Sequence, residues 1–100
     1  MKSLNYITII NTINELSKVE KIEISNKLLD ILNNNELPKA ENHNRKIDLT
    51  TSFFKIELDD EIIEEITDLL MDLEVASLTE NGESTKTTNY YVDLLNEWLN

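Results

Sequence analysis

The residues whose chemistry stands out in this sequence are carboxylates. Nine acidic residues and no basic residue lie between Glu57 and Glu74. Six of the nine share one side of a helical wheel, over an arc of about 140°. These six are Asp60, Glu61, Glu64, Glu65, Asp68 and Asp72. Such a surface attracts cations, basic proteins and grooves lined with lysine and arginine, and it repels nucleic acid.

The spacing of these acids is unfavourable for the helix that carries them. Like-charged neighbours four residues apart each cost about 0.2–0.5 kcal/mol of helix stability. Such pairs include Glu61–Glu65, Glu64–Asp68 and Asp68–Asp72. Alternating Glu and Lys would serve solubility better. Three interpretations stay open: a water-exposed face without a role, a docking surface for a basic partner, and loose binding of divalent cations.

An apolar stripe favours docking over the other interpretations. Met71, Val75 and Leu78 follow one another at spacings of four and three, on the acidic side of the same predicted helix. Apolar anchors rimmed by charge are common at protein interfaces. The alternative is that the last helix, or residues 47–58, covers these side chains inside the fold. We expect a basic partner to be attracted by five carboxylates and to make apolar contact with Met71 and Val75. The five carboxylates are those of Glu61, Glu64, Glu65, Asp68 and Asp72.

Other chemistry is not expected. His43, the single histidine, lies between two asparagines in a polar stretch and has no evident orienting partner. One glycine in the chain argues against a phosphate-binding loop, and the absence of cysteine argues against thiolate metal sites. We therefore predict no catalytic residue, no cofactor and no metal site.

The formal charge of −11 is confined to the second half of the chain. Residues 1–50 hold seven basic and seven acidic residues, whereas residues 51–100 hold two and thirteen. The length and the 40% hydrophobic content predict one folded domain spanning residues 1–100. Because Asn5, Asn11 and Asn14 interrupt the apolar N-terminal run, we expect no signal peptide, no membrane span and a cytoplasmic location.

Hydrophobic periodicity predicts a helical hairpin over residues 4–33. The first helix would expose Thr8, Thr12 and Glu15 on its polar side. A capping box formed by Ser17 and Glu20 would begin the second helix, and Asn33–Asn35 would end it.

The second half predicts two more helices. One runs over residues 60–78 with Asp59 as its N-cap, and the other runs over residues 88–99 from a cap near Thr87 and Thr88. Residues 47–58 fit either an extended segment or a short helix, and a strand there has no evident partner within the chain. At the last helix, Tyr91 and Trp98 are expected in the core and Tyr90 at its edge.

The sequence thus predicts an all-α, four-helix bundle-like domain. The stretch INELSKVEKIEISNKLLDIL, residues 13–32, resembles the helical hairpins of many small bacterial proteins, including some addiction-module components. The chain is small, acidic, helical and free of cysteine, and in this composition it is similar to bacteriocin or toxin immunity proteins and to phage-encoded inhibitors that mimic the charge of DNA. We expect a non-catalytic protein that inhibits or neutralises a basic partner, such as a toxin, a nuclease or another nucleic-acid-binding protein. The alternative is a helical homodimer that acts as an adaptor or regulator. Direct binding to nucleic acid or membranes is not expected.

Overall fold

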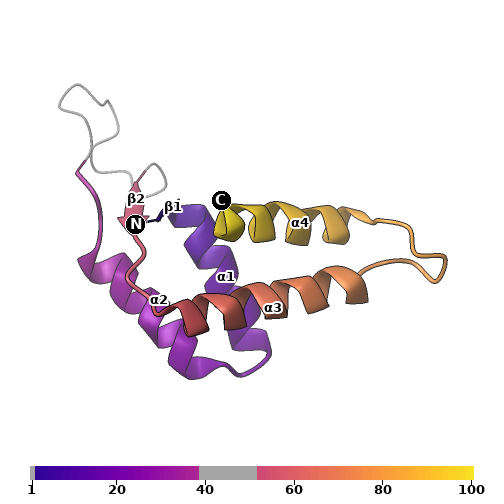
Figure 1. The fold of residues 1–100 in the computed structure, drawn as a ribbon, viewed down its shortest axis with the longest axis horizontal. Helices are drawn as coiled ribbons and strands as arrows, with labels where there is room; N and C mark the ends of the chain where they lie inside the picture. Colours follow the sequence, from indigo (N-terminus) through magenta and orange to yellow (C-terminus); the bar gives the residue numbers. More distant parts are fainter. Residues whose placement is uncertain (1, 39–51) are drawn as a thin grey trace. The chain divides into compact units, whose positions relative to one another are not determined.

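The computed structural model describes residues 2–38 and 52–100. Within them the chain forms β1 (Ser3–Asn5), α1 (Tyr6–Lys18), α2 (Ile22–Asn34), β2 (Phe53–Lys55), α3 (Asp60–Ala76) and α4 (Lys86–Leu99), as Figure 1 shows. The predicted all-α class with four helices is confirmed, and the short strands are an addition to it. The chain divides into two compact units, Met1–Glu57 and Leu58–Asn100.

The first unit is built on the predicted helical hairpin of α1 and α2. Its two helices bury aliphatic side chains that recur at helical spacing along each of them. These are Ile9, Ile13 and Leu16 in α1, and Ile24, Leu28 and Ile31 in α2. The second helix ends at Asn34, with Asn35 as its C-cap, in the asparagine run that was expected to stop it.

The connection between α1 and α2 differs from the prediction. Instead of capping a second helix, Ser17 lies within the last turn of α1, and α2 begins at Ile22 after an N-cap, Lys21, that makes no side-chain capping bond. Glu20 has φ of 62°, in the left-handed region. It closes the C-terminal end of α1 through its N–H, which donates to the carbonyl of Ser17 at 3.1 Å. The predicted capping box is therefore wrong, because Glu20 terminates one helix and does not begin the next.

The polar side of α1 is also less exposed than its composition suggested. Thr8, Thr12 and Glu15 are all buried. The Thr12 hydroxyl donates to the Thr8 carbonyl at 2.8 Å, which satisfies it within the helix. The Glu15 carboxylate lies 3.3 Å from the ammonium group of Lys18. These local partners let polar side chains be buried where the wheel predicted a water-facing surface.

The ambiguous segment before the third helix contains a strand with a partner in the same chain. β2 pairs antiparallel with β1, with Leu4 opposite Phe54, so the expectation of an unpaired segment is wrong. On its other side, β2 bonds to the chain just after α2, where the N–H of Leu37 donates to the Phe53 carbonyl at 2.8 Å. Phe54 lies between these neighbours and is fully buried. The strand is short, but hydrogen bonds on both edges explain its formation.

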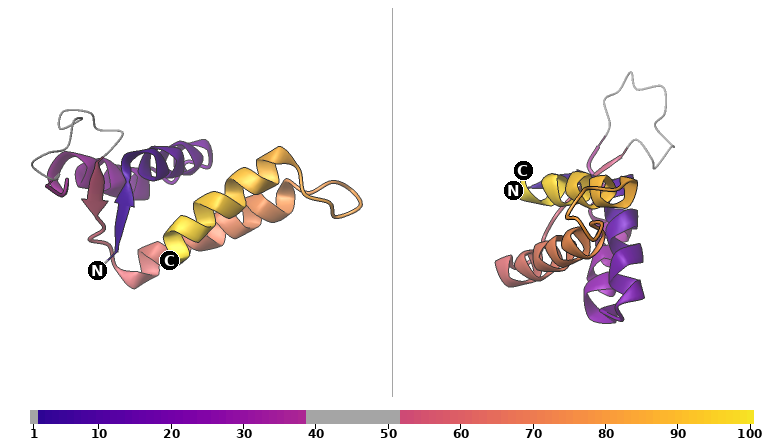
Figure 2. Two further views of the ribbon diagram at one scale, coloured as in Figure 1. Left: turned by 90° about the horizontal axis from the view of Figure 1, so that it is seen from above. Right: turned by 90° about the vertical axis from the view of Figure 1, so that its right-hand side faces the viewer.

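The second unit is a hairpin of α3 and α4, which lie side by side in Figures 1 and 2. Ile66 and Leu70 are the buried hydrophobic residues of α3, and Leu94, Leu95 and Trp98 are those of α4. Asp59 is the N-cap of α3 as predicted, although its side chain makes no capping bond. Trp98 is buried and Tyr90 is half-buried, both as expected, whereas Tyr91 is half-buried and not fully in the core.

Hydroxyl groups close the turn between α3 and α4. Thr85 is the N-cap of α4 and forms a capping box with Thr88, so this helix begins two residues earlier than predicted. The hydroxyl groups of Ser77 and Thr88 lie 2.7 Å apart, and the Thr85 hydroxyl lies 3.1 Å from the Ser77 carbonyl. Gly82 has φ of 78°, the left-handed conformation that glycine adopts without strain. The turn therefore fixes where α3 ends and α4 begins.

A candidate protein-binding surface

Three buried side chains, Ile66, Thr67 and Leu70, define the inner side of α3 and so determine which residues face water. The neighbouring positions on the wheel are half-buried, and they are occupied by Ile62, Ile63, Leu69 and Leu73. The opposite arc is exposed, and it carries Asp60 and all the carboxylates of α3 except that of Glu74, which lies on the inner side and is half-buried.

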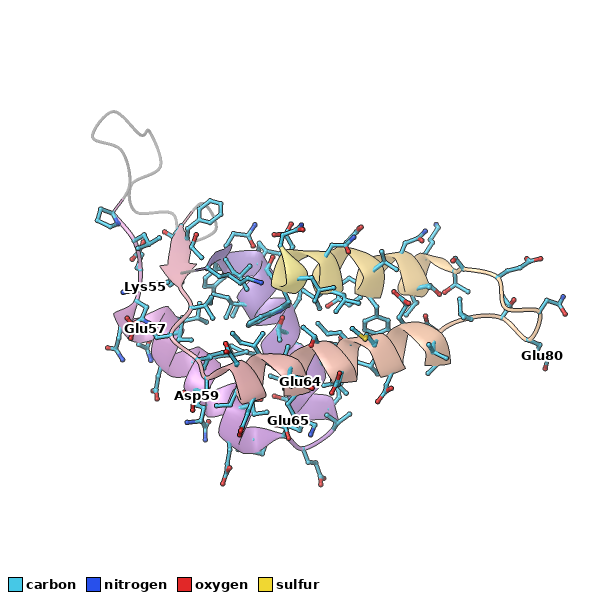
Figure 3. All side chains as sticks on the ribbon, in the orientation of Figure 1. Lys55, Glu57, Asp59, Glu64, Glu65 and Glu80 are labelled. Atoms are coloured by element: carbon cyan, nitrogen blue, oxygen red, sulfur yellow. The ribbon has the colours of Figure 1, made fainter. Side chains whose placement is uncertain are left out.

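All seven residues predicted as binding residues lie on this exposed arc. They are Glu61, Glu64, Glu65, Asp68, Met71, Asp72 and Val75. We call this set the acidic face. At 100° per residue they fill consecutive positions of the wheel over about 120°, with no other residue between them, and at 1.5 Å per residue they extend about 21 Å along the axis. Figure 3 labels Glu64 and Glu65 among them, along α3.

Four carboxylates of the acidic face have no ion pair with any lysine or arginine of the described residues. These are Glu61, Glu64, Asp68 and Asp72. Glu65 is not counted with them because it makes an interaction of its own. Two ion pairs of the described residues, Lys18–Glu15 and Lys55–Glu57, lie in the first unit. The charge of these four acids is therefore open to solvent and to a partner.

The apolar residues of the acidic face are exposed as well. Met71 is 42% exposed and Val75 is 65% exposed, the highest value among the large hydrophobic side chains of the described residues. Leu78, the third member of the predicted stripe, is half-buried. Within the second unit, α4 therefore leaves Met71 and Val75 uncovered.

The division into two units coincides with the division of charge. Residues 1–57 hold eight acidic and eight basic residues, so they carry no net charge. Residues 58–100 hold twelve acidic residues and a single base, Lys86, and so carry the entire charge of −11. Glu80, at the tip of the α3–α4 turn in Figure 3, adds to this potential. The helical hairpin that carries the acidic face is thus the source of the negative field of the protein.

A second exposed apolar pair was not predicted from the sequence. Leu37 and Phe53 are 37% and 52% exposed, and the hydrogen bond between their backbones holds the two residues next to each other. The sequence predicted only an extended segment or a short helix over residues 47–58. The pairing with Leu37 depends on a long-range contact, which local sequence patterns do not reveal.

The described part of the chain contains no group of three or more His, Cys, Asp or Glu side chains arranged to hold a metal ion. Among the same residues, no helix has the length and apolar character needed to cross a membrane. His43 and the basic residues Lys39, Arg45 and Lys46 lie outside the described residues.

Comparison of the chain with models of known protein families, with curated proteins and with solved structures finds no match.

Proposed function

We propose that this chain is a non-catalytic binding protein that inhibits or neutralises a basic protein, and that the acidic face of α3 is its binding surface. The observation that carries the proposal is the composition of that face. Seven consecutive wheel positions hold only carboxylates and two exposed apolar side chains, and no lysine or arginine interrupts them. A basic toxin, a nuclease or another nucleic-acid-binding protein has the complementary surface.

The two kinds of side chain have separate roles in this proposal. Carboxylates raise the rate of encounter with a cationic surface, from about 10⁵–10⁶ M⁻¹s⁻¹ for a neutral pair toward about 10⁸–10⁹ M⁻¹s⁻¹ at low salt. Burial of Met71 and Val75 then slows dissociation, because apolar contact is not screened by salt. The carboxylates lie mainly in the N-terminal half of the acidic face, and both apolar residues lie in its C-terminal half.

The experiment is capture of the partner on the immobilised chain, with two matched variants. The first variant, E61Q/E64Q/D68N/D72N, removes four charges from the acidic face. The second, E80Q/E83Q/D93N/E97Q, removes four charges from exposed positions in the turn and in α4, so it has the same net charge.

We expect a basic protein that binds the wild type and the second variant at low salt, and that is lost from the first variant. Equal capture by both variants would show that total charge, and not this face, recruits the partner. Capture of a neutral or acidic protein that persists at high salt would contradict the proposal.

Self-association is the second candidate, and the exposure of Met71 and Val75 is what favours it. In a homodimer these side chains would be covered by a second copy. Two copies that each carry −11 repel one another, so added salt should strengthen the homodimer and weaken a complex with a basic partner. Sedimentation of the pure protein across a range of salt concentrations separates the two candidates, because the sign of the salt effect differs.

A further inference from the structure

The turn between α3 and α4 contains an asparagine that is followed by glycine. Asn81 precedes Gly82, the single glycine of the sequence, whereas every other asparagine precedes a residue with a side chain or is the last residue. Asparagine is chemically labile because the backbone nitrogen of the next residue can attack its amide carbon. A glycine has no Cβ to hinder this approach, and its backbone reaches more conformations. Asn81 therefore has the most reactive neighbour of all the asparagines in the chain.

The surroundings of Asn81 and Gly82 leave both residues accessible. Both are exposed, and a Cβ added to Gly82 would meet no heavy atom within 4 Å apart from its chain neighbours. The adjacent Glu80 is also exposed, at the tip of the turn in Figure 3. Water and hydroxide can thus reach the Gly82 nitrogen and the Asn81 amide, and the described residues leave room for the amide to turn toward that nitrogen.

Hydrogen bonds to Thr79 hold this turn closed. The Gly82 N–H donates to the Thr79 carbonyl at 2.9 Å, and the Thr79 N–H donates to the Glu83 carbonyl at 2.9 Å. The Glu83 N–H donates to the Thr79 hydroxyl at 3.0 Å. The Gly82 nitrogen is therefore bonded in the closed turn and becomes free to react when the turn opens. Exposed turns open locally at a much smaller free energy than the whole fold, so these bonds slow the attack without preventing it.

We propose that Asn81 is a site of spontaneous deamidation in the folded protein. The Gly82 nitrogen loses its proton to hydroxide and forms a bond to Cγ of Asn81. The bond from Cγ to the amide nitrogen breaks, this nitrogen takes a proton from water, and ammonia leaves behind a succinimide ring. Water then adds to one of the two ring carbonyls and the ring C–N bond breaks. The product is aspartate, or isoaspartate in which the main chain runs through the former side chain.

The reaction changes both the charge and the backbone of the second unit. It adds a carboxylate next to Glu80, so the charge of residues 58–100 goes from −11 to −12. Isoaspartate also inserts a methylene group into the main chain before Gly82, which moves the Gly82 N–H out of register with the Thr79 carbonyl. The modified turn therefore holds the ends of α3 and α4 less firmly than the original one.

The test is incubation of the pure chain in heavy-oxygen water at neutral and at mildly alkaline pH. Isoelectric focusing follows the charge, and peptide mass spectrometry locates the heavy oxygen. We expect the wild type to shift by one band, faster at the higher pH, with heavy oxygen in the peptide that contains Asn81. Asn81→Gln should not shift by this route, because its longer side chain cannot close the succinimide ring.

A second pair of variants tests the control by the turn. Thr79→Val removes the acceptor of the Glu83 N–H and should deamidate faster than the wild type. Ser84→Ala is the control, since the exposed Ser84 hydroxyl makes no hydrogen bond with the described residues, and its rate should equal that of the wild type. A wild type that keeps its charge, heavy oxygen that enters first at another asparagine, or an equal shift in Asn81→Gln would overturn the inference. Equal rates for Thr79→Val and Ser84→Ala would refute the control by the turn.

Discussion

Asp68 is the acid of α3 with the least favourable surroundings, and its replacement by asparagine should stabilise the protein. Glu64 lies four residues before it and Asp72 four residues after it, and all three are exposed. Asp68 has no ion pair with the described residues, so no attraction to them is lost. The helix dipole favours a negative charge only in the first turn of α3, and Asp68 lies beyond that turn. Relief of two like-charged pairs contributes about 0.4–1 kcal/mol to the stability of D68N.

Urea unfolding followed by circular dichroism measures this gain directly. At low salt the midpoint of thermal unfolding should rise by about 2–8 °C, as a domain of this size gains about 4–8 °C per kcal/mol. In 1 M salt the gain should nearly vanish, because charges are screened over about 3 Å. Glu80→Gln is the control, since it removes one charge from the turn and relieves no helical pair. D68N that is no more stable than wild type at low salt, or equally stabilised at high salt, would refute the reasoning.

Three further substitutions test the fold, and urea unfolding measures each. Thr88→Val should lower the free energy of unfolding by about 1–3 kcal/mol, because it removes the hydroxyl that accepts from the Thr85 N–H at 3.0 Å. Thr87→Val, at an exposed position in the first turn of α4, is the control and should be close to neutral. Ser25→Ala should leave stability unchanged or raise it by about 1 kcal/mol relative to the exposed control Ser17→Ala, since the buried Ser25 hydroxyl has no partner among the described residues. Glu20→Gly should stabilise by about 1 kcal/mol, since it relieves a left-handed backbone, and Glu20→Ala should not; equal effects of the two would contradict the reasoning.

Hydrophobic periodicity was sufficient to predict the helices and which residues share the acidic face. A helix that buries Ile66 and Leu70 leaves only the opposite side for the seven residues from Glu61 to Val75, so the wheel places all seven on one side without knowledge of the rest of the fold. The wheel alone did not determine the exposure of Met71 and Val75, because the last helix or residues 47–58 could have covered them. In the structure, α4 leaves both side chains exposed.

Hydrophobic periodicity could not predict the pairing of β1 with β2 or the backbone of the connection between α1 and α2. Leu4 and Phe54, which pair in the sheet, are separated in the sequence by two helices. A strand of three residues also has too little alternation of apolar and polar side chains to be recognised. Ser17 and Glu20 satisfy the sequence pattern of a capping box, yet the backbone of Ser17 is still helical and Glu20 is left-handed. The burial of Glu15 similarly depends on tertiary packing and on the ion pair with Lys18, which composition does not reveal.

The most direct test of the central claim is the association rate of the captured partner, measured by stopped flow or surface plasmon resonance from low to high salt. The account predicts a rate for the wild type that falls by about 10²–10³ as salt screens the acidic face, with a much shallower fall for E61Q/E64Q/D68N/D72N. A wild-type rate that is independent of salt, or variants whose salt dependence matches that of the wild type, would contradict the role assigned to the acidic face of α3.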